Sequence, residues 1–151
     1  MSKNLIESTV IINAPIDQVW KTLTSFDYYY EWNPFTPKVE IEPVIGSTVG
    51  LHVRLNPNSQ QTMFQKETLL VWDEENKRLE WGIQNAWYVR TIRLQQLTDL
   101  GNNKTKYYTS DFFEGPLTKL ILWLYRNKIQ IGFDDVCNGL KQHLENPKVI
   151  I

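Results

Sequence analysis

Few residues in this chain could supply nucleophilic or metal chemistry. It contains two histidines, His52 and His143, and a single cysteine, Cys137. A nucleophile and its base must lie within hydrogen-bond reach, and a zinc site needs three or four ligands at recognisable spacing. His52 is remote in sequence from the other two, and no glycine-rich phosphate loop precedes a helix. We therefore predict no metal and no cofactor.

The positions of these three residues favour structural roles. Apolar residues alternate along 49–55, and His52 has the opposite phase, so we expect it to point away from the core. His143 falls at the end of a long helical pattern, where the helix dipole favours a cation. Cys137 adjoins the apolar stripe of that pattern and is expected to be a small core or boundary residue.

The polar residues of most interest come from strand alternation. In one expected strand Tyr88 and Arg90 share a face, and in the next strand Asp111 and Phe113 do so. If these faces are the inner ones, Arg90 and Asp111 should pair, because a buried charge is costly alone. Arginine stays protonated, so it is a poor general acid or base but can anchor a carboxylate or a polarised carbonyl. Arg90 then contacts a ligand, fixes strand register, or reaches solvent.

Aromatic residues make up 13% of the chain and include six tryptophans. They bury much surface for little rotamer entropy, which suits a core, a pocket wall or an interface. The aromatic and helical apolar residues that could line a pocket are Trp32, Phe35, Trp81, Trp87, Phe113, Ile121, Leu124 and Tyr125. The predicted ligand-binding site consists of this set without Trp87. It also includes Tyr88, Arg90 and Asp111.

The hydrophobic patterns predict one α+β domain over residues 1–151. A strand at 5–12 is followed by Asn13-Ala14-Pro15, which should end it and begin a short helix, and a second short helix or turn follows within 26–35. Six further strands are expected in succession, at 39–44, 48–55, 62–72, 78–84, 87–98 and 104–113. Strands that follow one another in this way predict an antiparallel meander.

A long helix is predicted from Pro116 to Glu145. Apolar residues recur there at steps of three or four, namely at Leu122, Tyr125, Ile129, Phe133, Val136, Leu140 and Leu144. A helix of about 30 residues spans roughly 45 Å, which is enough to cross a sheet. Its first half is apolar on a second side as well, and Gly132 and Gly139 indicate close packing or a bend.

Charge and composition narrow the classes of partner. The formal net charge is -1 with acids and bases mixed along the chain, which argues against nucleic acid. The first four residues lack the apolar run of a secretory signal, so we expect the cytoplasm. The longest apolar stretch, 117–124, is far shorter than the roughly 20 residues that span a bilayer, so we expect no integral membrane association.

Several short motifs give the chain a resemblance to a known superfamily. In order they are Ile12-Asn13-Ala14-Pro15 with Val19-Trp20, Trp32-Asn33-Pro34-Phe35, Phe113-Glu114-Gly115-Pro116-Leu117, and Gly132-Phe133 with Asn138-Gly139-Leu140-Lys141. With the element order β-α-α-β₆-α, the chain resembles the helix-grip fold of the START and polyketide-cyclase-like (SRPBCC) superfamily. The resemblance implies a curved antiparallel sheet of about seven strands wrapped around a long C-terminal helix, with an internal cavity. Many relatives in this superfamily carry a histidine near Arg90 and an acid at Asp111, so the resemblance implies that the arginine argues against proton transfer.

Three functions follow as hypotheses. The leading one is binding of a small hydrophobic molecule, such as a lipid or polyketide, without catalysis. The second is a cyclase or aromatase-like enzyme acting in the same cavity without a metal. The third is a cochaperone-like protein-interaction domain, for which Tyr28, Tyr29 and Tyr30 could form a docking surface.

Overall fold

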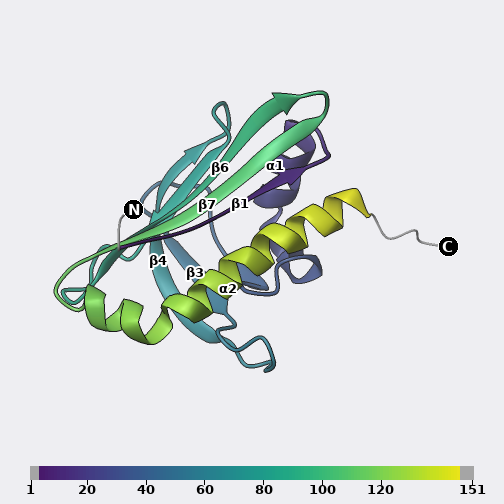
Figure 1. The fold of residues 1–151 in the computed structure, drawn as a ribbon. Coiled ribbons are helices and arrows are strands. Elements are labelled where there is room, and N and C mark those ends of the chain that lie inside the picture. Colours follow the sequence, from purple (N-terminus) through teal and green to yellow (C-terminus); the bar gives the residue numbers. More distant parts are fainter. Residues whose placement is uncertain (1–3, 147–151) are drawn as a thin grey trace.

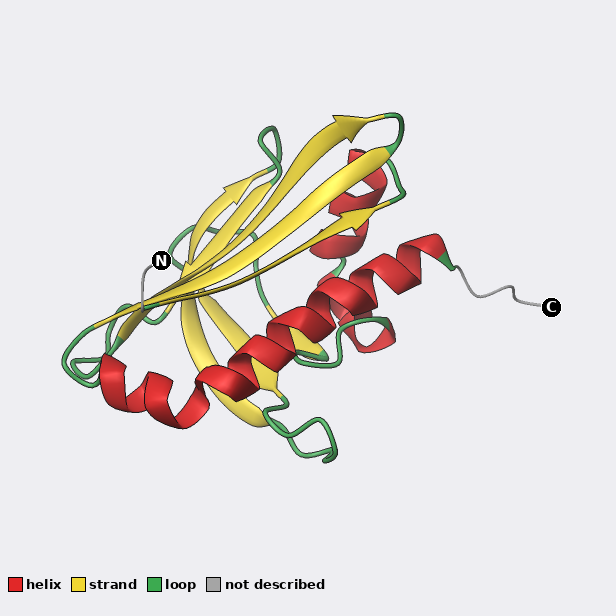
Figure 2. Ribbon diagram, in the orientation of Figure 1, coloured by secondary structure: helices red, strands yellow, loops and turns green. Residues whose placement is uncertain are grey.

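Seven strands form one antiparallel sheet, and a long C-terminal helix lies across one of its faces (Figures 1 and 2). The computed structural model describes residues 4–146. Residues 1–3, on which the expectation of no signal sequence mainly rests, lie outside the described residues. The elements are β1 (Leu5–Ile12), α1 (Ile16–Thr24), the 3₁₀ helix η1 (Phe26–Glu31), β2 (Lys38–Glu40), β3 (Thr48–Val53), β4 (Met63–Asp73), β5 (Arg78–Gly82), β6 (Arg90–Gly101), β7 (Lys104–Glu114) and α2 (Thr118–Glu145). The predicted α+β helix-grip architecture is confirmed.

The first strand completes the sheet beside the last one. The strand order is β1-β7-β6-β5-β4-β3-β2, so every strand from β2 to β7 pairs with its neighbours in sequence. All pairings are antiparallel, and β1 joins β7 with Ile6 opposite Asp111. The predicted meander is therefore confirmed, and the β1–β7 pairing places the first and last strands of the chain side by side.

Two short helices connect β1 to β2. The first strand ends at Ile12, and Pro15 directly precedes α1. The Pro15 carbonyl accepts hydrogen bonds from Gln18 N at 3.0 Å and Val19 N at 3.1 Å, which begins α1. The buried face of α1 carries Val19, Trp20 and Leu23. In η1, Tyr29 is buried while Tyr28 and Tyr30 are exposed, so only two of the three tyrosines proposed for docking reach the surface.

The inner face of α2 packs closely against the loop that contains Trp32 and Phe35. A Cβ atom on Gly139 would lie 2.0 Å from the Trp32 carbonyl oxygen, and one on Gly132 would lie 2.2 Å from the Phe35 ring. Cys137 is buried in the same face. The sequence predicted either close packing or a bend at these glycines, and the structure shows close packing. Cys137 is a core residue, as expected.

Two predicted strands have boundaries that differ most from those observed. The strand expected at 39–44 ends at Glu40, because the chain turns at 42–47, where Val44 N bonds to the Glu42 carbonyl oxygen at 2.8 Å. The strand expected at 87–98 runs from Arg90 to Gly101 instead, and Trp87 and Tyr88 lie in the loop before it. Within residues 4–146, no helix is long and apolar enough to cross a membrane.

The contact at Gly139 yields a test of the packing. Glycine to alanine normally stabilises a helix interior by about 1 kcal/mol. We expect Gly139→Ala to destabilise the protein by about 1–3 kcal/mol instead, because the Trp32 backbone must move to admit the methyl group. Urea unfolding against the exposed neighbour Asn138→Ala, which should be neutral or slightly stabilising, provides the measurement. A stabilised Gly139→Ala protein would contradict the close approach.

Candidate functional site

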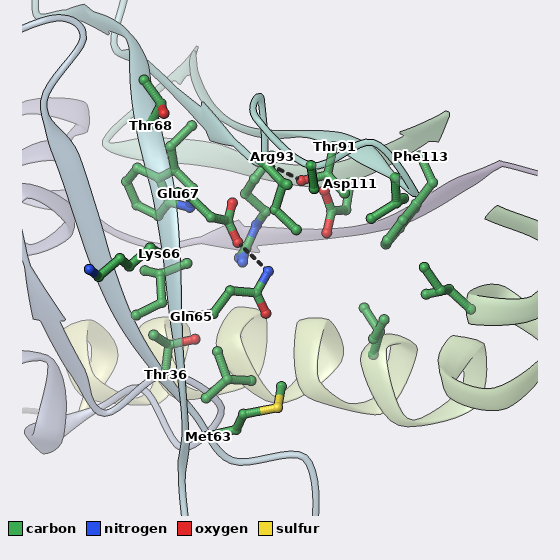
Figure 3. Close-up of a pocket in the computed structure, with 18 of the residues that line it drawn as sticks. Thr36, Met63, Gln65, Lys66, Glu67, Thr68, Thr91, Arg93, Asp111 and Phe113 are labelled. Atoms are coloured by element: carbon green, nitrogen blue, oxygen red, sulfur yellow. Dashed lines mark hydrogen bonds between the residues drawn. The ribbon is translucent and has the colours of Figure 1, made fainter. Parts of the chain in front are cut away.

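A cavity of about 780 Å³ lies between the inner face of the sheet and the first half of α2. Strands β3 to β7, the loop before β6 and the residues around Phe35 form its walls, with Ile121, Tyr125 and Ile129 of α2 opposite (Figure 3). Seven of the ten residues predicted to bind a ligand line it: Phe35, Trp81, Tyr88, Asp111, Phe113, Ile121 and Tyr125.

The other three predicted residues are not among those that line the cavity. Trp32 is buried in the core, with its ring 4.6 Å from that of Tyr29. Leu124 is on the solvent side of α2, where 51% of its surface is exposed. Arg90 is exposed at the end of β6 and pairs with Glu114 at 3.1 Å.

The expected pairing of Arg90 with Asp111 is therefore wrong, and Arg93 occupies the inner position. Strands β6 and β7 place Arg93 opposite Asp111 and Arg90 opposite Glu114. The inner face of β6 carries Thr91, Arg93 and Gln95. The prediction assumed that the apolar residues of β6 point inward, but this strand has polar residues inside and Ile92 outside.

Three charged side chains from neighbouring regions of the sheet converge at the cavity wall. Glu67 of β4, Arg93 of β6 and Asp111 of β7 all line the cavity, and Figure 3 shows the Arg93 side chain between the two carboxyl groups. Sequence reasoning missed Arg93 and Glu67. The sequence signal for Arg93 was a charged residue within a strand of alternating pattern. The prediction chose Arg90 as the inward-facing charge instead.

Arg93 is held firmly although only 8% of its surface is exposed. Its Nε donates to Thr109 Oγ1 at 2.8 Å, and the Thr109 hydroxyl donates in turn to the Leu94 carbonyl oxygen at 2.9 Å. Its guanidinium carbon lies 4.1 Å from the centre of the Phe133 ring on α2, a cation–π contact. The side chain thus links β6, β7 and α2.

Burial changes the acidity of both carboxyl groups. It raises the pKa of Glu67 from its ordinary 4.5 to about 8, with the negative charge of Asp111 adding to the increase. It raises the pKa of Asp111 from 3.8 to about 7. Arg93 opposes both increases, and Gln65 Nε2, which donates to Glu67 Oε2 at 2.9 Å, opposes the first. Near neutral pH the two carboxyl groups therefore hold at least one proton between them.

Two polar atoms of the cavity wall are buried without a hydrogen bond among the described residues: Asp111 Oδ1 and Trp81 Nε1. Asp111 Oδ1 can accept a hydrogen bond and Trp81 Nε1 can only donate one. Burying such groups unpaired costs free energy, so native proteins seldom do so without a reason. Trp81 and Asp111 both line the cavity, so these two unpaired atoms lie in its wall.

The residues considered for nucleophilic or metal chemistry lie elsewhere. His52 is on the outer face of β3, with Nε2 3.2 Å from Glu40 Oε2, as its phase predicted. His143 is in the last turn of α2. Residues 4–146 contain no group of three or more histidine, cysteine, aspartate or glutamate side chains arranged to hold a metal ion.

Comparison with known families matches residues 5–145 to the family described as polyketide cyclase/dehydrase and lipid transport. The chain belongs to this family. The resemblance to the START and polyketide-cyclase-like superfamily is confirmed by this match and by the solved structures below. A search of curated protein sequences gives no significant match.

Solved structures with a similar fold include proteins of different functions. The Zhui aromatase/cyclase from Streptomyces sp. R1128 has a TM-score of 0.68 and 18% identity, over 97% of this chain and 98% of its own. Norcoclaurine synthase from Thalictrum flavum gives 0.69 and 13%, over 97% and 88%. A START superfamily protein from Mycobacterium smegmatis gives 0.60 and 15%, over 90% and 98%. At these identities the likeness concerns the fold.

The raised pKa values of Glu67 and Asp111 predict how the stability of this protein depends on pH. Unfolded glutamate and aspartate lose their protons near pH 4, whereas the folded protein retains them up to about pH 7 to 8. The free energy of unfolding should therefore fall as pH rises from about 5 to 8. Glu67→Gln should make this decline smaller in thermal melts across that range.

Glu114→Gln serves as the control, because Glu114 is exposed at the end of β7 and lies outside the buried cluster, so the slope should be unchanged. A Glu67→Gln slope identical to that of the unaltered protein would show that Glu67 is ionised when folded.

Proposed function

We propose that this protein binds a small, largely apolar molecule with a neutral or weakly acidic oxygen group, such as a phenol or a ketone. The observation that carries the proposal is an apolar cavity of about 780 Å³ with Glu67, Arg93 and Asp111 at its wall. A volume in this range suits a drug-sized molecule, and apolar walls with a few converging polar groups are typical of such sites.

The charges at the wall select the polar end of the ligand. Arg93 is always positive, while the raised pKa values leave about one negative charge on Glu67 and Asp111 together near neutral pH. The cluster is then close to neutral overall, so a fully ionised ligand gains little there. A hydroxyl or carbonyl group can hydrogen-bond to Arg93 or to a carboxyl group of this cluster without adding charge.

The proposal predicts that binding depends on Arg93 and not on Arg90. Quenching of tryptophan fluorescence should show 2-naphthol binding more tightly than naphthalene, because Trp81 lines the cavity. Arg93→Met should remove most of this preference, roughly a tenfold change for one charge-assisted hydrogen bond. Arg90→Met is the matched control, since Arg90 is three residues earlier on β6 and exposed.

Since Arg93 also supports the fold, Asp111→Asn provides a second variant that keeps the shape of the side chain. Preference for 2-naphthol that survives in both Arg93→Met and Asp111→Asn would count against this polar centre.

Native mass spectrometry of the protein from its source cells would identify the ligand. We expect a stoichiometric apolar molecule that dissociates on unfolding. Ile121→Trp should exclude it by filling the cavity, whereas Leu124→Trp, on the solvent side of the same helix, should not. Equal ligand content in both variants would place binding outside the cavity.

A second candidate function is proton-transfer catalysis of the cyclase or dehydratase kind. The supporting observation is that two carboxyl groups with raised pKa values lie beside an arginine in an apolar cavity, an arrangement suited to acid–base chemistry near neutral pH. Two of the similar structures are an aromatase/cyclase and norcoclaurine synthase. Chemical conversion of the identified ligand that is lost in Glu67→Gln would favour this function, whereas recovery of an unchanged ligand would favour binding alone.

A further inference from the structure

The solvent-facing side of α2 changes character halfway along the helix. At steps of three or four, its first half presents Leu120, Leu124, Asn127 and Ile131, and its second half presents Asp134, Asn138 and Gln142. Trp123 lies beside the first group and is 80% exposed. A surface helix normally carries polar residues on this side, as the second half does.

A second exposed tryptophan lies in the loop next to the start of α2. Trp87 is 78% exposed, and its ring packs edge-on against Tyr88 with centroids 5.8 Å apart. The loop is fixed to the helix, because Leu117 N donates to the Tyr88 carbonyl oxygen at 3.0 Å. Trp87, Leu120, Trp123, Leu124 and Ile131 are called the apolar band below.

The apolar band adjoins residues that line the cavity. Tyr88, which follows Trp87, lines the cavity, and so do Ile121 and Tyr125, which adjoin the exposed residues of α2. Figure 1 places the start of α2 beside the ends of β6 and β7, at the end of the molecule away from α1. The residues that face solvent here are therefore continuous with those that face the cavity.

Positive charge accompanies the apolar band. The segment 115–133 contains Lys119, Arg126 and Lys128 and no acidic residue. Lys119 and Lys128 are exposed and take part in no ion pair within residues 4–146, and the nearest acid before them, Glu114, is paired with Arg90. The polar second half of α2 begins with Asp134 and Asp135. Cations and exposed apolar residues thus share the same half of the helix.

We propose that the apolar band docks on the surface of an anionic lipid bilayer and holds this side of the cavity against it. Tryptophan is favoured at the boundary between lipid headgroups and acyl chains, and helices that lie in this boundary combine apolar and cationic residues. Lys119 and Lys128 complement the negative headgroups. Two exposed tryptophans, exposed aliphatic side chains and exposed lysines thus share this region, and this combination favours a bilayer as the occupant.

Sedimentation of the full chain with phospholipid vesicles tests the proposal, and it requires no cavity ligand. We expect binding to vesicles of phosphatidylcholine mixed with phosphatidylglycerol, weaker binding to phosphatidylcholine alone, and weakening by salt. Trp123→Ser should reduce affinity about tenfold, the effect of losing one buried aromatic side chain. Lys119→Glu with Lys128→Glu should do at least the same. All three side chains are exposed, so the fold should be retained.

Tyr30→Ser is the matched control, because Tyr30 is 67% exposed but lies in η1, outside the apolar band. Absence of vesicle binding, equal binding to both kinds of vesicle, or equal losses in Trp123→Ser and Tyr30→Ser would each overturn the proposal. So would a dimer in solution that Trp123→Ser dissociates, since the apolar band would then be an interface between two copies. Failure here would leave ligand binding in the cavity, measured with 2-naphthol, unaffected.

Discussion

A single helix lies across one face of a seven-stranded sheet that is much wider than the helix, and the site follows from this mismatch in width. Strands about 4.8 Å apart make a sheet roughly 29 Å wide, whereas a helix with its side chains is about 10–12 Å across. Helix α2 packs mainly against β1 and β7, and α1 and η1 cover part of the remainder. Between them the inner face of the sheet remains partly uncovered, and the cavity occupies that space.

Arg93 shows how the sheet tolerates a charge at this wall. The guanidinium group bonds to Thr109, lies against the Phe133 ring, and has Glu67 and Asp111 nearby. A core selected for stability alone would be expected to replace such a cluster with apolar residues, often at no loss. The presence of three ionisable groups beside the cavity is therefore consistent with the ligand recognition that we propose.

The two faces of α2 connect the proposed ligand site with the proposed docking surface. Its inward residues Ile121 and Tyr125 line the cavity, while Trp123 and Leu124 between them face solvent. The sequence shows apolar residues on two sides of the first half of this helix, which predicts that other parts of the protein cover both sides. The structure assigns one side to the cavity and leaves the other exposed, so a molecule leaving a membrane would have a short apolar path to the cavity.

The sequence by itself determined the order of the elements, the antiparallel meander and the inner face of α2, because these depend on local periodicity and on proline and glycine positions. It also placed Asp111 correctly at the cavity wall. It did not determine which face of β6 points inward. Alternation gives two faces but not their direction, and hydrophobicity misassigned them because β6 has Thr91, Arg93 and Gln95 inside. Only the tertiary structure decided this, since Thr109, Tyr107 and Phe133, from distant parts of the chain, supply the partners that make a polar inner face stable.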